Sequence, residues 1–152
     1  MQDVNLKLTI LQDILVKKKS LLSQVLSITD NQEQILQHSD GNPEIKQMFS
    51  EMNIEKQNLI DNIMAADTLF QNMFGEISDE LSNSTTDFRP RILALQALIR
   101  EVMDLDIKIR VREQRNKDIV SKTYTKPKIN VPKASKAYML EQYKQQNKKN
   151  SE

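Results

Sequence analysis

The sequence predicts an all-α protein, an elongated antiparallel three-helix bundle of coiled-coil type with a basic C-terminal tail. Three observations predict this class. The 152 residues include only two glycines and no tryptophan, so the turn glycines and aromatic strand residues typical of β-rich folds are scarce. Apolar residues recur at alternating spacings of three and four over three long stretches. Two short stretches of polar and helix-ending residues separate them.

The first predicted helix covers about residues 4–38 and carries two rows of apolar side chains. One row comprises Val4, Leu8, Leu11, Leu15, Leu22 and Val25, and the second comprises Ile10, Ile14, Leu21, Ile28 and Ile35. Together the rows cover a wide arc. We expect a helix with so wide an apolar arc to contact two neighbouring helices, or one neighbour and a partner.

The second predicted helix, about residues 43–82, has the most regular pattern. It follows the stretch HSDGNPE, in which Asn42 suits a helix cap and Pro43 the first helical position. Its core positions are Ile45, Phe49, Met52, Lys56, Leu59, Ile63, Ala66, Phe70, Met73 and Ile77. Lys56 is the only polar residue in this series.

The third predicted helix, about residues 88–121, follows the turn-forming stretch SNSTTDFRP. Its main apolar row comprises Phe88, Ile92, Leu95, Ile99, Val102 and Ile109, flanked by Leu98 and Leu105. Pro127 prevents the helix from continuing undisturbed. Short connections of this kind join antiparallel neighbours, although a helical hairpin that dimerises into a four-helix bundle is an alternative, which leaves a homodimer open.

A second apolar patch lies on this third helix, about 100° from the main row. It comprises Leu93, Met103, Ile107 and Val111. One interpretation is ordinary core on a helix with a wide apolar face. The other is a groove wall for a partner helix. The same two interpretations apply to the methionines of the second helix, because methionine fills cores and also lines adaptable binding surfaces. These are Met48, Met52, Met64 and Met73.

The C-terminal tail differs in charge from the rest of the chain. Residues 122–152 hold eight lysines and two glutamates, a net charge of +6, whereas residues 1–121 carry −5. Residues 135–146 can form a short helix bearing Tyr138, Met139 and Tyr143, and a disordered end is the alternative. Because residues 1–121 are acidic and the tail lacks arginine, we expect no nucleic-acid partner.

Residues suited to catalysis or cofactor binding are scarce. The chain has no cysteine and a single histidine, so a zinc site is not expected. Two isolated glycines cannot form a phosphate-binding loop. The sequence also lacks a secretory signal and the roughly 20 consecutive apolar residues of a membrane-spanning helix. We therefore expect a cytoplasmic protein that is not an enzyme, uses no cofactor and does not insert stably into a membrane.

Three stretches carry a resemblance to a known family. They are SITDNQEQILQ at the end of the first helix, GNPEIKQMFSEMNIEKQNLIDNI across the break and second helix, and LQALIREVMDLDIKIRVREQRNKDI in the third helix. In these stretches the chain resembles flagellar export chaperones of the FlgN/FliT type, in particular clostridial-like members. Membership on the FlgN-like or the FliT-like side stays open.

The resemblance implies a cytoplasmic chaperone of flagellar type III export. Such a protein binds an amphipathic helix of a hook-associated or cap protein before secretion and delivers it to the export gate. The expected client-binding residues lie on the first and third helices: Ile14, Leu21, Ile28, Leu93, Met103, Ile107 and Val111. Tyr138, Met139 and Tyr143 are expected to contact the export gate. A self-associating coiled-coil or adaptor protein without a client is the alternative.

Overall fold

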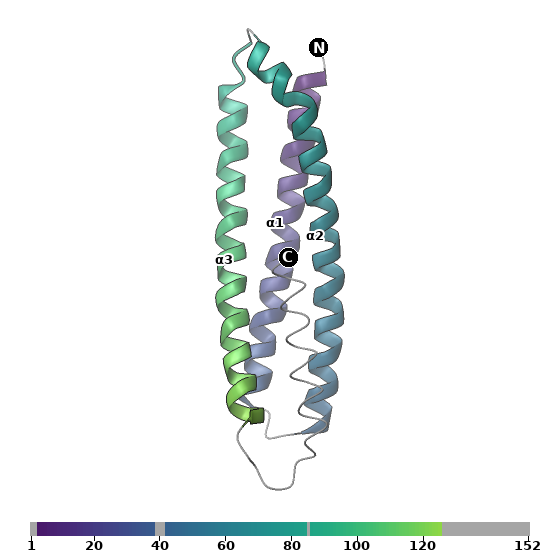
Figure 1. The fold of residues 1–152 in the computed structure, drawn as a ribbon, viewed down its shortest axis with the longest axis vertical. Coiled ribbons are helices and arrows are strands. Elements are labelled where there is room, and N and C mark those ends of the chain that lie inside the picture. Colours follow the sequence, from purple (N-terminus) through teal and green to yellow (C-terminus); the bar gives the residue numbers. More distant parts are fainter. Residues whose placement is uncertain (1–2, 39–41, 85, 126–152) are drawn as a thin grey trace. The chain divides into compact units, whose positions relative to one another are not determined.

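A computed structural model describes residues 3–38, 42–84 and 86–125, which contain three helices and no strand (Figure 1). The helices are α1 (Asp3–Gln37), α2 (Pro43–Asn83) and α3 (Arg89–Thr125). The predicted all-α helical bundle is thereby confirmed. The predicted tail helix at residues 135–146, with Tyr138, Met139 and Tyr143, lies outside the described residues.

Polar side chains fix the beginnings of α2 and α3. The amide of Glu44 donates a hydrogen bond to Asn42 Oδ1 at 3.0 Å, so Asn42 caps α2 as the sequence predicts. Pro43 is the first residue of α2. Proline is tolerated there because an amide hydrogen at this position would have no acceptor within the helix. At α3, the amide of Arg89 donates to Asp87 Oδ1 at 3.0 Å. The first helical hydrogen bond of α3 then joins the amide of Ile92 to the carbonyl of Phe88.

The contacts of the chain divide it into two units, and each helix contributes to both. Within the described residues, unit 1 consists of residues 3–24 and 59–107, and unit 2 of residues 25–58 and 108–125. Within each unit, the segment of α2 runs antiparallel to the segments of α1 and α3 (Figure 1). Each unit is therefore a short three-helix bundle with its own core.

The core of unit 1 is apolar. Val4, Leu8, Leu11 and Leu15 of α1 are buried together with one side chain from each of the other helices, Ile77 of α2 and Leu95 of α3. These α1 residues are the first of the two apolar rows on α1. Since this row packs against both α2 and α3, the expectation that the wide apolar arc of α1 contacts two neighbours is confirmed.

The apolar core of unit 2 is smaller. Val25, Leu36, Phe49, Ile109 and Val120 are its buried apolar residues. Leu36, Phe49 and Val120, one from each helix, form a cluster with the partly buried Ile119 packed against them. The remaining interior positions of unit 2 include polar side chains. Every buried polar or charged side chain among the described residues belongs to this unit: Thr29, Gln32, Asn53, Lys56, Glu113 and Asn116. Among the described residues, the interior of unit 1 is therefore apolar, whereas the interior of unit 2 also contains polar and charged side chains.

Candidate functional site

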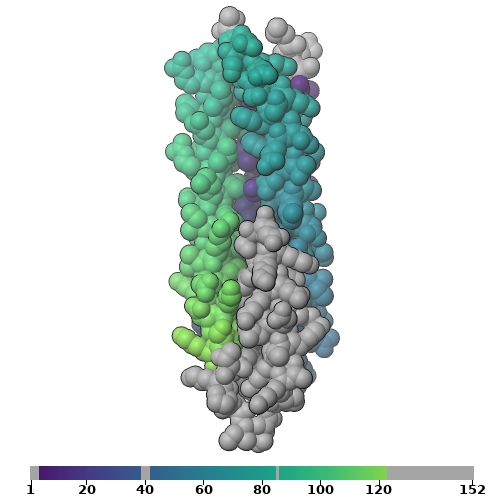
Figure 2. Space-filling view, viewed as in Figure 1, coloured from purple at the N-terminus to yellow at the C-terminus, as the bar shows by residue number. Residues whose placement is uncertain are grey.

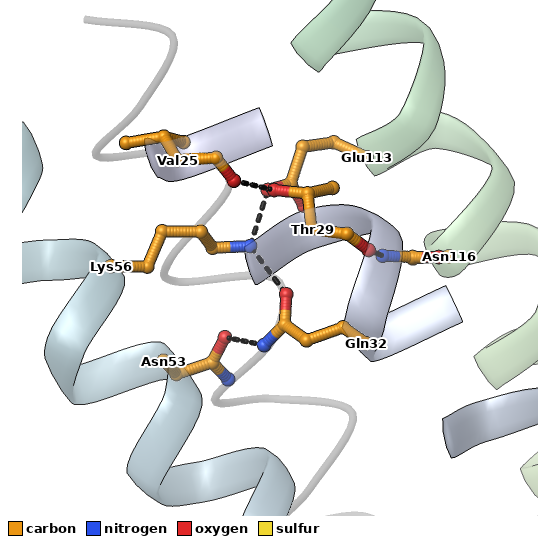
Figure 3. A network of polar contacts seen from close by, with 7 residues as sticks. All are labelled: Val25, Thr29, Gln32, Asn53, Lys56, Glu113 and Asn116. Carbon is orange, nitrogen blue, oxygen red and sulfur yellow. Dashed lines mark hydrogen bonds and ion pairs between the residues drawn. The ribbon is translucent and has the colours of Figure 1, made fainter. Parts of the chain in front are cut away.

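The polar interior of unit 2 is centred on Lys56. This residue occupies a core position of α2, at the seven-residue spacing that also buries Phe49 and Ile63. Its side chain is only 1% exposed. The helical periodicity therefore directs the aliphatic stem inward, and the ammonium group meets side chains of α1 and α3 (Figure 3).

Two acceptors hold the Lys56 ammonium group. Its Nζ donates to Gln32 Oε1 of α1 at 2.6 Å and to Glu113 Oε1 of α3 (Figure 3). The second contact is an ion pair between side chains that are 1% and 10% exposed. A buried ammonium group without a counterion would be strongly unfavourable, and Glu113 supplies the opposite charge.

Further hydrogen bonds connect this pair to all three helices. Gln32 Nε2 donates to Asn53 Oδ1 of α2 at 2.8 Å, so Gln32 joins α1 to α2 through both ends of its amide. Asn116 Nδ2 of α3 donates to the carbonyl oxygen of Thr29 at 3.1 Å. The Thr29 hydroxyl donates to the Val25 carbonyl oxygen at 2.8 Å and lies 3.3 Å from Glu113 Oε1. We call these six side chains, from Thr29 to Asn116, the polar network.

An ion pair at the surface of unit 2 joins α1 to α3 beside the polar network. Arg112 Nε donates to Asp30 Oδ1 at 2.8 Å, and the two side chains are 32% and 43% exposed. α1 and α3 are thus held together by this pair and by the Asn116–Thr29 hydrogen bond. Neither contact involves α2.

Burial changes the protonation chemistry of Lys56. Removal from water lowers the pKa of Lys56 from its ordinary value of 10.5, because burial disfavours the charged form. The Glu113 carboxylate opposes this effect through its charge and its hydrogen bond. Lys56 and Glu113 are buried and pair with each other, so the polar network joins helices.

The lowered pKa of Lys56 predicts a pH dependence of stability. At pH values between the lowered pKa and 10.5, Lys56 is protonated in a larger fraction of unfolded chains than of folded chains. The free energy of unfolding therefore rises with pH in this window. Urea unfolding of wild type and Lys56→Met from neutral pH to the alkaline end of this window measures the effect. We expect the difference in unfolding free energy to shift in favour of the wild type as pH rises.

The exposed Lys108 of α3 provides the control for this titration. Lys108→Met also removes one positive charge from unit 2, but from its surface. A wild-type advantage over Lys56→Met that stays constant or shrinks with rising pH would contradict the prediction.

The sequence indicated only part of the polar network. Lys56 was conspicuous as the one polar residue in the core series of α2, but its partners were not predicted, because Glu113 is 57 residues away in the chain. The six network residues all fall within the three stretches that carry the family resemblance. The sequence feature that could have indicated the partners of Lys56 is that they are polar residues next to the apolar rows.

The predicted client-binding residues of α3 are exposed. Leu93, Met103 and Ile107 in unit 1 are 54%, 56% and 56% exposed, and Val111 in unit 2 is also exposed. The interpretation of this patch as ordinary core is therefore wrong. These residues lie outside the buried row of α3, and the neighbouring helices leave them uncovered.

The predicted client-binding residues of α1 lie deeper. Ile14 and Ile28 are half-buried. Leu21, at 8% exposure, is a buried residue of unit 1 and offers no accessible binding surface in this structure. The reason is that the two apolar rows of α1 lie beside each other, so packing against two helices covers part of the second row as well as the first.

Unit 1 is hollowed between α2 and α3. In the part of Figure 2 that unit 1 occupies, atoms of α1 (purple) are visible between α2 (teal) and α3 (green). We call this hollow the unit 1 furrow. Six apolar side chains that pack against the core of unit 1 remain only partly buried: Phe70, Met73, Leu81, Phe88, Leu98 and Ile99.

Unit 1 also contains an aromatic pair on α2 and an ion pair between α1 and α2. The rings of Phe70 and Phe74 stack with centroids 6.2 Å apart, and Phe74 is 48% exposed. Lys18 occupies the spacing of the buried Leu11 and Val25 on α1, yet carries a charge. Its Nζ lies 2.5 Å from Asp67 Oδ1 of α2. Unit 1 thus combines uncovered apolar and aromatic surface with a partly buried ion pair.

None of the helices, over the residues the structure describes, is both long enough and apolar enough to cross a membrane. Within residues 3–38, 42–84 and 86–125, no group of three or more His, Asp or Glu side chains is arranged to hold a metal ion. Comparison of the chain with family models, with curated proteins and with solved structures found no match.

Proposed function

We propose that this protein is a cytoplasmic chaperone of flagellar type III export that binds an amphipathic helical segment of a hook-associated or cap protein. The observation that carries the proposal is the uncovered apolar surface of unit 1, where side chains such as Phe70 and Met73 beside the core are only partly buried and others such as Met103 and Ile107 are exposed. Exposed apolar side chains that gather on a helical bundle can mark a site for a partner.

An amphipathic helix fits this surface for a physical reason. Three helices leave part of each apolar face uncovered when two of them are separated by a furrow, and a fourth helix can cover what remains. The methionines Met64, Met73 and Met103 are flexible and adapt to different apolar side chains, which suits the binding of several clients. The family resemblance supports the identity of the client class.

The proposal also assigns Tyr138, Met139 and Tyr143 to contact with the export gate. These residues lie outside the described part of the chain, so the assignment depends on the resemblance and on the tyrosine-bearing, basic sequence of the tail.

Charge introduced on α3 is expected to weaken client binding. The protein would be co-expressed with the hook-associated and cap proteins of its own cell, and the soluble complex purified and its dissociation constant measured. We expect Met103→Lys/Ile107→Lys to weaken binding by about tenfold or more, because two exposed apolar contacts are replaced by charges. Both side chains are exposed, so circular dichroism should report an unchanged fold.

A matched control places the same charge elsewhere. Met48 and Ile54 of α2 are 48% and 63% exposed and belong to unit 2, and Met48→Lys/Ile54→Lys should leave client binding intact. Absence of any co-purifying client, together with intact flagella after deletion of the gene, would refute the chaperone proposal. Light scattering distinguishes the chaperone from the alternative function, since a stable dimer without a client would favour a self-associating coiled-coil protein.

A further inference from the structure

The segment of α2 within unit 2 buries more polar than apolar side chains. Of residues 43–58, only three side chains are buried, and two of them, Asn53 and Lys56, are polar or charged. Phe49 is the single buried apolar side chain of this segment and contributes to the small apolar core of unit 2. The segment of α2 within unit 1 buries only apolar side chains, Ile63, Ala66 and Ile77.

This difference bears on how easily the segment separates from its neighbours. Removing an apolar side chain from a core loses the hydrophobic free energy of its burial. Removing a hydrogen-bonded polar group loses less, because water replaces the lost hydrogen bonds. Separation also returns the Lys56 ammonium group to water, which relieves the desolvation that opposes its charged form.

The contacts between α1 and α3 in unit 2 do not depend on this segment. Arg112 pairs with Asp30, and Asn116 donates to the carbonyl oxygen of Thr29. Asn116 Oδ1 accepts no hydrogen bond from a described residue, so access of water there would satisfy a buried acceptor. α1 and α3 can therefore remain paired while the α2 segment departs.

We propose that residues 43–58 form a strap that opens from α1 and α3 of unit 2 as one segment, with the contacts of Lys56 and Asn53 as its latch. Opening breaks the contacts of Lys56 with Gln32 and Glu113 and the contact of Asn53 with Gln32. It uncovers Leu36 and Val120, which Phe49 covers in the closed state. The strap is a property of unit 2 and does not depend on the proposed chaperone function.

Hydrogen exchange of the full chain, followed by mass spectrometry, tests the strap. We expect amides of residues 46–58 to exchange about tenfold or more faster than those of residues 63–77 in the same helix, and faster than those of residues 29–36 in α1. Equal protection of the two segments of α2 would overturn the proposal. So would exchange of residues 46–58, 29–36 and 113–120 in a single step, since unit 2 would then open as a whole.

An apolar latch should keep the strap closed. In Lys56→Met/Glu113→Leu the polar contacts are replaced by apolar side chains, and we expect exchange of residues 46–58 to slow about tenfold while unit 1 is unaffected. Lys108→Met and Glu55→Leu change one exposed lysine and one exposed glutamate and serve as controls. Equal slowing in both units, or no slowing, would contradict the role of Lys56 and Glu113 as the latch.

The absence of cysteine provides an independent measurement. A single cysteine in place of the buried Asn53 would report opening through its rate of reaction with a thiol reagent, and Ala66→Cys, buried in unit 1 on the same helix, is the matched reference. We expect the cysteine at position 53 to react about tenfold or more faster. Equal rates would refute the strap even if the double variant failed to fold.

Discussion

Replacement of Glu113 by leucine is expected to lower the free energy of unfolding by about 3–5 kcal/mol, because it leaves the buried Lys56 ammonium group without its counterion. The Lys56 side chain is 1% exposed, so water cannot take the place of the carboxylate. Among the described residues, the neutral amide oxygen of Gln32 would still accept a hydrogen bond from the ammonium group. Urea unfolding at neutral pH, followed by circular dichroism, measures the loss.

Two further variants show whether the loss arises from the unpaired charge. In Lys56→Met/Glu113→Leu both charges are absent, and we expect a protein as stable as the wild type or up to about 4 kcal/mol more stable. Glu101→Leu breaks the exposed pair between Lys19 and Glu101, whose side chains are 43% and 51% exposed. This change should cost no more than about 1 kcal/mol. A double variant as unstable as Glu113→Leu would contradict the explanation.

Replacement of Leu11 by alanine is expected to cost about 2–5 kcal/mol, through the lost burial and the cavity left behind. Leu11 is fully buried in the apolar core of unit 1, in the same cluster as Ile77 and Leu95 of the other two helices. Among the described residues of unit 1, no polar or charged side chain is buried that could draw water into the space. Urea unfolding of the variant measures the cost.

Leu6 supplies the control for this change within the same helix. Its side chain is 60% exposed, so Leu6→Ala should alter the free energy of unfolding by no more than about 0.5 kcal/mol. Similar losses in Leu6→Ala and Leu11→Ala would mean that helix propensity, and not core packing, determines the effect.

Seven-residue periodicity predicted the cores well for residues whose neighbours are apolar. Val4, Leu8 and Leu11 were placed in the first row of α1 by spacing alone, and they are buried. The same reasoning left two interpretations for Leu93, Met103 and Ile107, because a wide apolar arc does not show how much of it the neighbouring helices cover. Only the positions of those helices decided that these residues are exposed and that Leu21 is buried.

The sequence by itself determined the class of this protein: three helices, the capped beginning of α2, and apolar rows that require packing on two sides. These features depend on local backbone preferences and on the period of a single helix, so they can be read along the chain. Tertiary structure alone decided which charges are paired inside unit 2. Lys56 meets Gln32 and Glu113 across 24 and 57 residues of chain, and no local pattern fixes which positions of three separate helices lie opposite one another.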